Sequence, residues 1–111
     1  MFSYKLGRRK IYFTNHALDR WWERCNKNKG LGRNESVSLL SEVLGKGRWT
    51  TEMPAWSRLS LWNRSIAEGF IYVDQDSGFV INRNRVSRDR VAVTYIENIE
   101  VNPDSYKRFS K

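Results

Sequence analysis

The 111-residue chain contains a single cysteine and a single histidine. One cysteine excludes a disulfide within the chain, which fits a reducing compartment, and Cys25 falls in an apolar stripe instead of a reactive setting. Together the two residues supply too few ligands for a zinc site of the usual four side chains. The opening residues lack the apolar run of a secretory signal, and no segment approaches the length of a membrane span. We therefore expect a cytoplasmic protein that has no membrane partner, no metal and no cofactor.

Acidic residues are also scarce, since twelve Asp and Glu stand against twenty Lys and Arg, giving a formal net charge of +8. Residues 1–33 carry nine basic and two acidic groups, and residues 80–90 carry four basic and one. Such a balance is typical of proteins that bind nucleic acid, an acidic protein or an anionic membrane surface. The plain alternative is a solvated basic surface without a partner. We expect the two basic segments to form one positive face.

Two helices are predicted in the first half of the chain. Apolar residues after Thr14 recur at helical spacing and indicate an amphipathic helix that is capped by Thr14 or Asn15 and is ended by residues 26–30 with the glycines Gly30 and Gly32. A second helix is predicted from about Ser36 to Leu44, because its apolar residues have the same spacing and a glycine follows. Trp21 and Trp22 of the first helix are expected in the core.

Strands are predicted on both sides of the helices. The predicted strands are Lys10–Phe13, Phe70–Asp74, Phe79–Asn84 and Val91–Glu97. The residues around Gly7 form either two short strand pieces or an arm, and residues 46–69 are ambiguous, with a short helix through Leu59, Trp62 and Ile66 as one reading. Helices grouped before an antiparallel meander indicate an α+β fold. We expect one domain over residues 1–111, with an N-terminal strand and two helices packed on a C-terminal antiparallel sheet.

The single histidine begins a series of side chains at four-residue steps: His16, Arg20 and Arg24. Four-residue steps keep all three on one flank of the predicted helix. Histidine is well suited to proton transfer near neutral pH, and arginine to holding phosphate. We interpret the three as candidate catalytic residues. The structural alternative is a capping or surface histidine, with the arginines paired to Asp19 or Glu23.

The sequence around these residues resembles a known family. A strand that ends in threonine, then NHALDRWWER, and later VAVTY at residues 91–95, resemble small bacterial and phage domains of the RelE-like toxin superfamily. Those domains have a strand, H-A-x-x-R-x-x-x-R and a final V-x-V-T-x-Y strand. FTNHALDR is also similar to the H-x-L-D-R segment of RegB-type phage endoribonucleases, which share the fold. The resemblance covers residues 10–27 and 69–97 and leaves residues 46–68 as a Trp-rich insertion.

This resemblance implies a metal-independent endoribonuclease of toxin or phage host-takeover type. By motif position it places His16 and Arg20 in the active site. It also implies RNA as the partner, including mRNA on the ribosome, with a host protein or an antitoxin as a further partner. The phage enzymes use a second histidine, which this chain lacks. The candidates for the second catalytic group are Arg83, Arg85, Tyr72 and Tyr95.

Other residues are candidates for RNA contact. The cationic candidates are Arg83, Arg85, Arg88 and Arg90, together with Arg8, Arg9 and Lys10. Arg83 and Arg85 are two apart on a predicted strand, so we expect them on the same side. The aromatic candidates are Trp49, Trp56, Trp62 and Tyr95, because unpaired bases stack on aromatic rings. The alternatives are a solvated loop for the arginines and core packing for the aromatic residues.

Two functions are open at this point. The first is an RNA-binding endoribonuclease in which the RNA's own 2′-hydroxyl is the nucleophile, His16 is base or acid, and arginines stabilise the phosphorane. The second is a non-catalytic phage or mobile-element protein that binds and inhibits a host nucleoprotein complex such as RNA polymerase, the ribosome or a defence complex. The Trp-rich segment 46–68 favours the second, because aromatic residues and arginine are typical interface anchors.

Overall fold

The computed structural model describes residues 2–57 and 67–98, and they form an α+β fold. The elements are β1 (Ser3–Leu6), β2 (Arg9–Phe13), α1 (Asn15–Lys29), α2 (Arg33–Gly45), β3 (Arg48–Thr50), β4 (Ala67–Asp74), β5 (Ser77–Arg83) and β6 (Arg90–Glu97). This confirms the predicted fold class and the predicted meander of three C-terminal strands. Of the two readings of the opening residues, the one with two short strands around Gly7 is correct.

The six strands form one mixed sheet in the order β1-β2-β6-β5-β4-β3. Every neighbouring pair is antiparallel except β2 and β6, which run parallel with Ile11 opposite Arg90 and Phe13 opposite Ala92. The C-terminal strands β4, β5 and β6 are antiparallel as predicted, but the N-terminal strands join the same sheet instead of packing on it, and the sheet is therefore mixed. Ile11 and Phe13 are buried, and a place inside the sheet gives them apolar neighbours that a separate N-terminal strand lacks.

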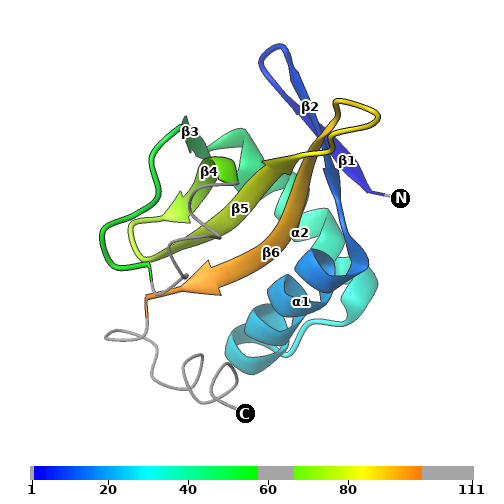
Figure 1. Cartoon of the computed structure of the whole chain (residues 1–111). Helices are drawn as coiled ribbons and strands as arrows, with labels where there is room; N and C mark the ends of the chain where they lie inside the picture. The colour runs from blue at the N-terminus through cyan, green and yellow to red at the C-terminus, as the bar shows by residue number, and fades with distance from the viewer. Residues whose placement is uncertain (1, 58–66, 99–111) are drawn as a thin grey trace.

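Both helices pack on one face of the curled sheet, and α1 lies along β6 (Figure 1). The main core fills the space between helices and sheet; its buried residues are Ile11, Phe13, Ala17, Leu18, Trp21, Cys25, Leu40, Leu44, Ile71, Phe79, Ile81, Ala92 and Tyr95. A smaller cluster, made of Phe70, Val80 and Ile96 with neighbouring half-buried residues, covers part of the other face. The two clusters follow from the alternation of side chains along β4, β5 and β6.

The first helix begins and ends as predicted. Thr14 Oγ1 accepts a hydrogen bond from the Ala17 N–H at 3.0 Å and donates to the Val93 carbonyl at 3.3 Å, so the cap also fastens α1 to β6. Gly30 closes the helix at φ 65°, in the left-handed region. The second helix starts at Arg33, earlier than predicted, because Gly32 takes the N-cap position: its N–H donates to Glu35 Oε1 at 3.3 Å and its carbonyl accepts from the Ser36 N–H at 2.9 Å. Neither helix is long and apolar enough to cross a membrane.

The segment after α2 is partly integral to the sheet. β3 pairs with β4, with Trp49 opposite Ile71, so at least this piece of the predicted insertion belongs to the fold. The short helix predicted through Leu59, Trp62 and Ile66 falls within residues 58–66, which lie outside the described residues.

Candidate nucleic-acid interface

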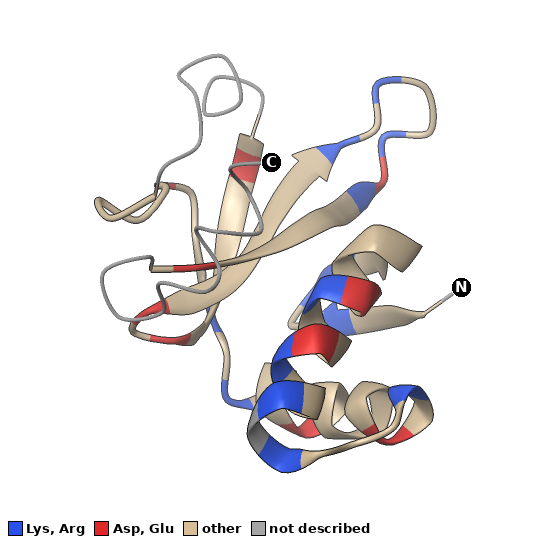
Figure 2. Cartoon of the chain, turned by 90° about the horizontal axis from the view of Figure 1, so that it is seen from below, with Lys and Arg blue, Asp and Glu red and all other residues tan. Residues whose placement is uncertain are grey.

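The two basic segments of the sequence meet at one end of the sheet. Because β2 and β6 run parallel with Ile11 opposite Arg90, the β1–β2 turn and the β5–β6 loop emerge at the same end. Both extend beyond the sheet in Figure 1, and blue positions gather on the β5–β6 loop in Figure 2. We call this region the basic end. Its cationic residues are Lys5, Arg8, Arg9, Lys10, Arg83, Arg85, Arg88 and Arg90, and its acidic residues are Glu68 and Asp89.

The carboxylate of Glu68 forms ion pairs with two of these cations, Arg83 and Arg90. Glu68 Oε1 lies 2.6 Å from Arg83 Nη2 and 3.2 Å from Arg90 Nε. The hydrogen bond from Arg83 and the charge of Arg90 hold the pKa of Glu68 below its usual range, although partial desolvation acts against them. The sequence placed Arg83 and Arg85 on one strand, but β5 ends at Arg83 and Arg85 lies in the loop. The expected row of arginines is therefore divided into an ion cluster of Arg83 with Arg90 and an exposed loop pair of Arg85 with Arg88.

The β5–β6 loop is organised by its own hydrogen bonds. Asn84 Oδ1 accepts from the N–H groups of Val86 at 2.8 Å and Ser87 at 3.0 Å, and the Asn84 carbonyl accepts from the Arg88 N–H at 2.9 Å. Arg88 adopts a φ of 67°, which is uncommon for a residue with a side chain. Val86 is 94% exposed, and Arg85 is exposed beside it. The loop therefore has a backbone conformation fixed by its own hydrogen bonds, and its cationic side chains are exposed to solvent.

The tryptophans predicted as base contacts are anchored in the protein where the structure describes them. Trp49 lies against Gly69 so closely that a Cβ there would be 2.6 Å from the ring. The guanidinium carbon of Arg9 lies 4.8 Å from the centre of the Trp49 ring. Trp56 is half-buried and donates from Nε1 to a backbone carbonyl of the β4–β5 turn at 3.1 Å. Trp62 lies outside the described residues.

Tyr12 is an aromatic residue of the basic end that the sequence reasoning missed. Its ring is half-exposed, and Lys10 Nζ lies 5.2 Å from the ring centre. The signal was present, because Lys10 and Tyr12 alternate with the buried Ile11 and Phe13 and so lie on the outer face of β2. Its neighbour across the sheet is Val91 of β6.

Arg24, the third candidate catalytic residue, is engaged within the protein. Its Nη1 donates to Ser77 Oγ at 2.9 Å and to the Tyr95 hydroxyl, its Nη2 donates to Asp74 Oδ2 at 2.8 Å, and its Nε lies 3.7 Å from Glu97 Oε2. Desolvation acts to lower the pKa of Arg24, but the contacts with Tyr95 and Asp74 outweigh it and raise that pKa. Burial also raises the pKa of Tyr95 well above its usual value. Tyr95 is a buried, protonated phenol, so its ring is not a surface for base stacking.

His16 and Arg20 lie on the same flank of α1 as Arg24 but nearer its start. His16 is exposed in the first turn. The Arg20 side chain is 13% exposed, and its Nε lies 3.9 Å from Glu23 Oε2 one turn later. At 1.5 Å per residue, His16 and Arg24 are about 12 Å apart along the helix. The three candidate residues are thus spread along the helix instead of converging on one point, and the catalytic role of His16 and Arg20 stays a prediction.

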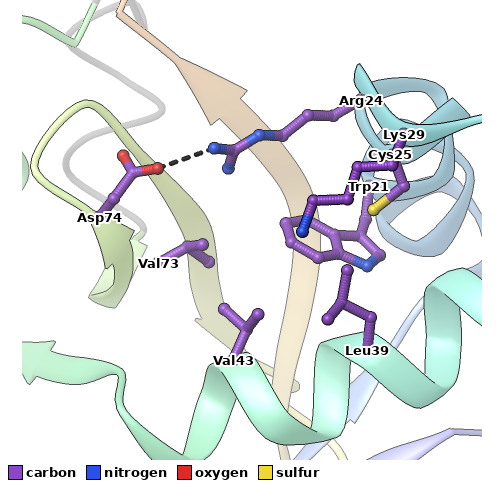
Figure 3. Close-up of a pocket in the computed structure, with 8 residues that line it drawn as sticks. All are labelled: Trp21, Arg24, Cys25, Lys29, Leu39, Val43, Val73 and Asp74. Atoms are coloured by element: carbon purple, nitrogen blue, oxygen red, sulfur yellow. Dashed lines mark hydrogen bonds and ion pairs between the residues drawn. The ribbon is translucent and has the colours of Figure 1, made fainter. Parts of the chain in front are cut away.

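A pocket of about 250 Å³ lies beside Arg24, between α1, α2 and the end of β4 (Figure 3). It is lined by Trp21, Arg24, Cys25, Lys29, Leu39, Val43, Val73 and Asp74. The Arg24–Asp74 ion pair spans one side of it. Burial raises the pKa of the Cys25 thiol, while Arg24 and Lys29 act against that effect. A buried neutral thiol is a poor nucleophile, so Cys25 belongs to the core.

The sequence reasoning also missed the partners of the arginines. The sequence placed Asp74 at the end of one predicted strand and Ser77 between two predicted strands, and Glu68 fell in the ambiguous segment. No periodic signal marks such partners, because each depends on the register of β4, β5 and β6. Only the alternation along β2, which places Tyr12 outward, was available from the residues alone.

Comparisons with protein-family models, with curated proteins and with solved structures gave no match for this chain. The similarity to RelE-like toxins therefore rests on the motif residues around His16 and on the VAVTY strand.

Proposed function

We propose that this protein binds RNA through the basic end of its sheet. The observation that carries the proposal is the parallel pairing of β2 with β6, which brings two separate basic segments to one place. Arg8, Arg85 and Arg88 are exposed there. Exposed guanidinium groups on two adjoining loops match the phosphates of a polyanion, and arginine binds phosphate through paired hydrogen bonds.

A single strand fits this surface better than a duplex. Two loops of unequal length and the half-exposed Tyr12 ring form the basic end. Proteins recognise single-stranded RNA by stacking unpaired bases on aromatic or arginine side chains while cations hold the backbone. A duplex hides the faces of its bases and would leave Tyr12 without a ligand.

Salt dependence tests the proposal. With five to seven phosphate contacts, the affinity for single-stranded RNA should fall by roughly 10²–10³-fold between 50 and 200 mM salt, because each contact releases counterions. The measurement is a titration of a labelled oligoribonucleotide at four salt concentrations. A flat salt dependence would remove RNA binding as the function and leave a protein partner.

Cleavage of the bound RNA is a second candidate activity, and the position of His16 favours it. β2 runs from the basic end to the start of α1, about 13 Å, and His16 is exposed in the first turn of that helix. An RNA strand held at the basic end needs only a few nucleotides to reach it. The likeness of the motif to RelE-like and RegB-type domains supports both this activity and a RelE-like variety of the α+β fold.

The chemistry requires no metal. A base removes the proton of the 2′-hydroxyl, the 2′-oxygen attacks phosphorus, and a 2′,3′-cyclic phosphate forms as the bond to the 5′-oxygen breaks. An acid then gives that leaving oxygen a proton. His16 supplies the base or the acid, and Arg20 stabilises the charge on the phosphorane.

Binding without cleavage is the rival, and the engagement of Arg24 favours it, because its guanidinium group already donates to Ser77 and Asp74. Incubation with total RNA in EDTA separates the two activities. Fragments would establish metal-independent cleavage, and intact RNA would leave a protein that binds RNA or a host nucleoprotein complex without cutting it.

A further inference from the structure

An open pocket of about 390 Å³ lies between the outer face of the sheet and the β5–β6 loop. It is lined by Tyr12, Asn84, Ser87, Asp89 and Val91. Tyr12 and Val91 are direct neighbours in the parallel β2–β6 pair, and Ile11, Phe13 and Ala92, which alternate with them, are buried on the helix side. The volume lies within the range of about 300–1,000 Å³ that is usual for ligand pockets.

The pocket combines one aromatic ring with a small set of polar groups. Within the part of the chain that the structure describes, the Asp89 carboxylate has no hydrogen-bond or ion-pair partner. Asn84 uses Oδ1 for two loop amides, which leaves its Nδ2 to donate. Ser87 Oγ accepts from the Asp89 N–H at 3.3 Å, which leaves its own hydrogen to donate. The pocket thus offers a ring face, two carboxylate acceptors and two donors.

We infer that this pocket binds one unpaired guanine base of the RNA, an inference that rests on the proposed RNA binding. The Watson–Crick edge of guanine carries the O6 acceptor beside two donors, N1–H and N2–H. Asp89 accepts from both donors, Asn84 or Ser87 donates to O6, and Tyr12 stacks on the ring.

The other bases fit this set of groups less well. Adenine and cytosine place an unprotonated ring nitrogen, which is an acceptor, where guanine has N1–H, and that nitrogen would face the carboxylate. Uracil has a single ring N–H between two carbonyls, so it satisfies one carboxylate oxygen only. The pocket therefore favours guanine through its hydrogen bonds. It also disfavours the other bases, because they leave the Asp89 carboxylate partly or wholly without a donor.

The charge of Asp89 is itself an argument for base recognition. A carboxylate in a basic loop weakens the attraction for phosphate, so it is unfavourable for a loop that only holds the backbone. Lys10 beside the Tyr12 ring, with Arg85 and Arg88 on the loop, places cations around the pocket for the phosphates that flank the base. Lys10, Arg85 and Arg88 would thus contact the RNA backbone, while Asp89 would contact the base.

The test uses labelled RNA octamers: eight uridines, and the same strand with guanosine, inosine or adenosine at the fourth position. For the full-length protein at 100 mM salt, the guanosine octamer should bind roughly 5–100-fold more tightly than the adenosine octamer. Inosine lacks the N2 amino group and should fall between them. Asp89→Asn should bind the guanosine and adenosine octamers equally, and should bind the uridine octamer at least as tightly as the original protein.

Glu42→Gln is the matched control, because it removes the same charge from an exposed position on α2 and should keep the preference for guanosine. Tyr12→Leu should weaken binding of the guanosine octamer about 5-fold or more, while Tyr12→Phe should not. Each variant should melt within about 3 °C of the original protein, since these changes are at the surface.

The outcomes separate the two levels of inference. Salt-dependent binding of every octamer without preference for guanosine would overturn the pocket's role and leave RNA binding intact. The same holds if Asp89→Asn keeps the preference. Failure to bind any octamer in a salt-dependent way would instead overturn the proposed function on which the pocket depends.

Discussion

Arg24 joins the first helix to the ends of three strands through one guanidinium group. Its partners are Asp74 at the end of β4, Ser77 at the start of β5, and Tyr95 and Glu97 on β6. The Glu97 side chain is 8% exposed, so water cannot easily replace the arginine beside it. Arg24 therefore stabilises the fold mainly because its removal would leave these polar and charged groups without a partner, which costs free energy.

Arg24→Met keeps the aliphatic part of the side chain and removes the charge. We expect it to lower the free energy of unfolding by about 2–3 kcal/mol, below the value for a fully buried pair because Asp74 is partly exposed. Arg33→Met is the control, since it breaks an exposed ion pair with Asp19 and should cost less than about 1 kcal/mol. Urea unfolding measures both. Equal costs would show that the Arg24 contacts contribute no more than a surface pair.

The same contacts predict an acid dependence. Desolvation acts to raise the pKa of Asp74, but hydrogen bonds from Arg24, from the Asp76 N–H and from Ser77 outweigh it and hold that pKa below its usual range. A carboxyl whose pKa is lowered by folding stabilises the fold above its unfolded pKa, near 4, and loses that contribution as pH falls through the folded pKa. The free energy of unfolding should therefore decrease as the pH is lowered below about 4.

Arg24→Met should make this fall smaller, because Asp74 then titrates nearer its ordinary value. Arg83 lowers the pKa of Glu68 as well, but this contribution to the acid dependence should be the same in the original protein and in Arg24→Met. Unfolding free energies at pH 3 and pH 6 measure the difference. An unchanged pH dependence in Arg24→Met would place the acid sensitivity elsewhere.

His16 allows a sharper test of catalysis. Because it is exposed, His16→Ala should leave folding nearly unchanged, and it removes at most one of several phosphate contacts. As a general acid or base it would account for about 10²–10⁴-fold in rate. Single-turnover cleavage of a labelled RNA, with binding and melting measured alongside, checks this. Undiminished cleavage would remove His16 from the mechanism, and a much lower melting temperature would show that it is structural.

At the scale of elements, the β5–β6 loop supplies exposed cations that belong to no ion pair among the described residues. Arg85→Ala with Arg88→Ala should lower RNA affinity roughly 10-fold or more and reduce the slope of log affinity against log salt by about 1.4, at 0.7 per lost contact. Lys27→Ala with Arg33→Ala removes two charges near the α1–α2 connection, away from the basic end in Figure 1. Equal losses would mean that net charge, and not this loop, controls binding.

The elements also show how far the sequence predicts this fold. α1 was predictable because Thr14 and Gly30 fix its ends through contacts within a few residues. The place of β2 was not, because its partner β6 lies almost eighty residues later and nothing local specifies a parallel register. The ion pairs of Glu68 with Arg83 and Arg90 were not predictable for the same reason, because they depend on how β4, β5 and β6 pair.

Across the whole molecule, the two ends of the sheet differ in how their charges are paired, because Arg85 and Arg88 are exposed at the basic end while Arg24 pairs with Asp74 and Glu97 at the other end. β5 and β6 meet the basic end where they adjoin their loop, and Asp74, Asp76 and Glu97 lie at the other end of the same strands. Exposed cations at one end attract a polyanion over a distance and so favour encounters that begin with the proposed binding surface. The sequence predicted the two basic segments, but their common end follows from the topology.

The parallel pair of β2 and β6 also has a consequence for biosynthesis. At about 5–20 residues per second, the ribosome finishes β6 roughly 4–17 s after β2, so β2 waits that long for its partner. During this interval the emerging chain is already strongly basic, yet it has neither the paired loops nor the pocket between them. The surface that would recognise RNA is therefore complete only once β6 has been made, and a chain without β6 can attract RNA by charge without selecting any base.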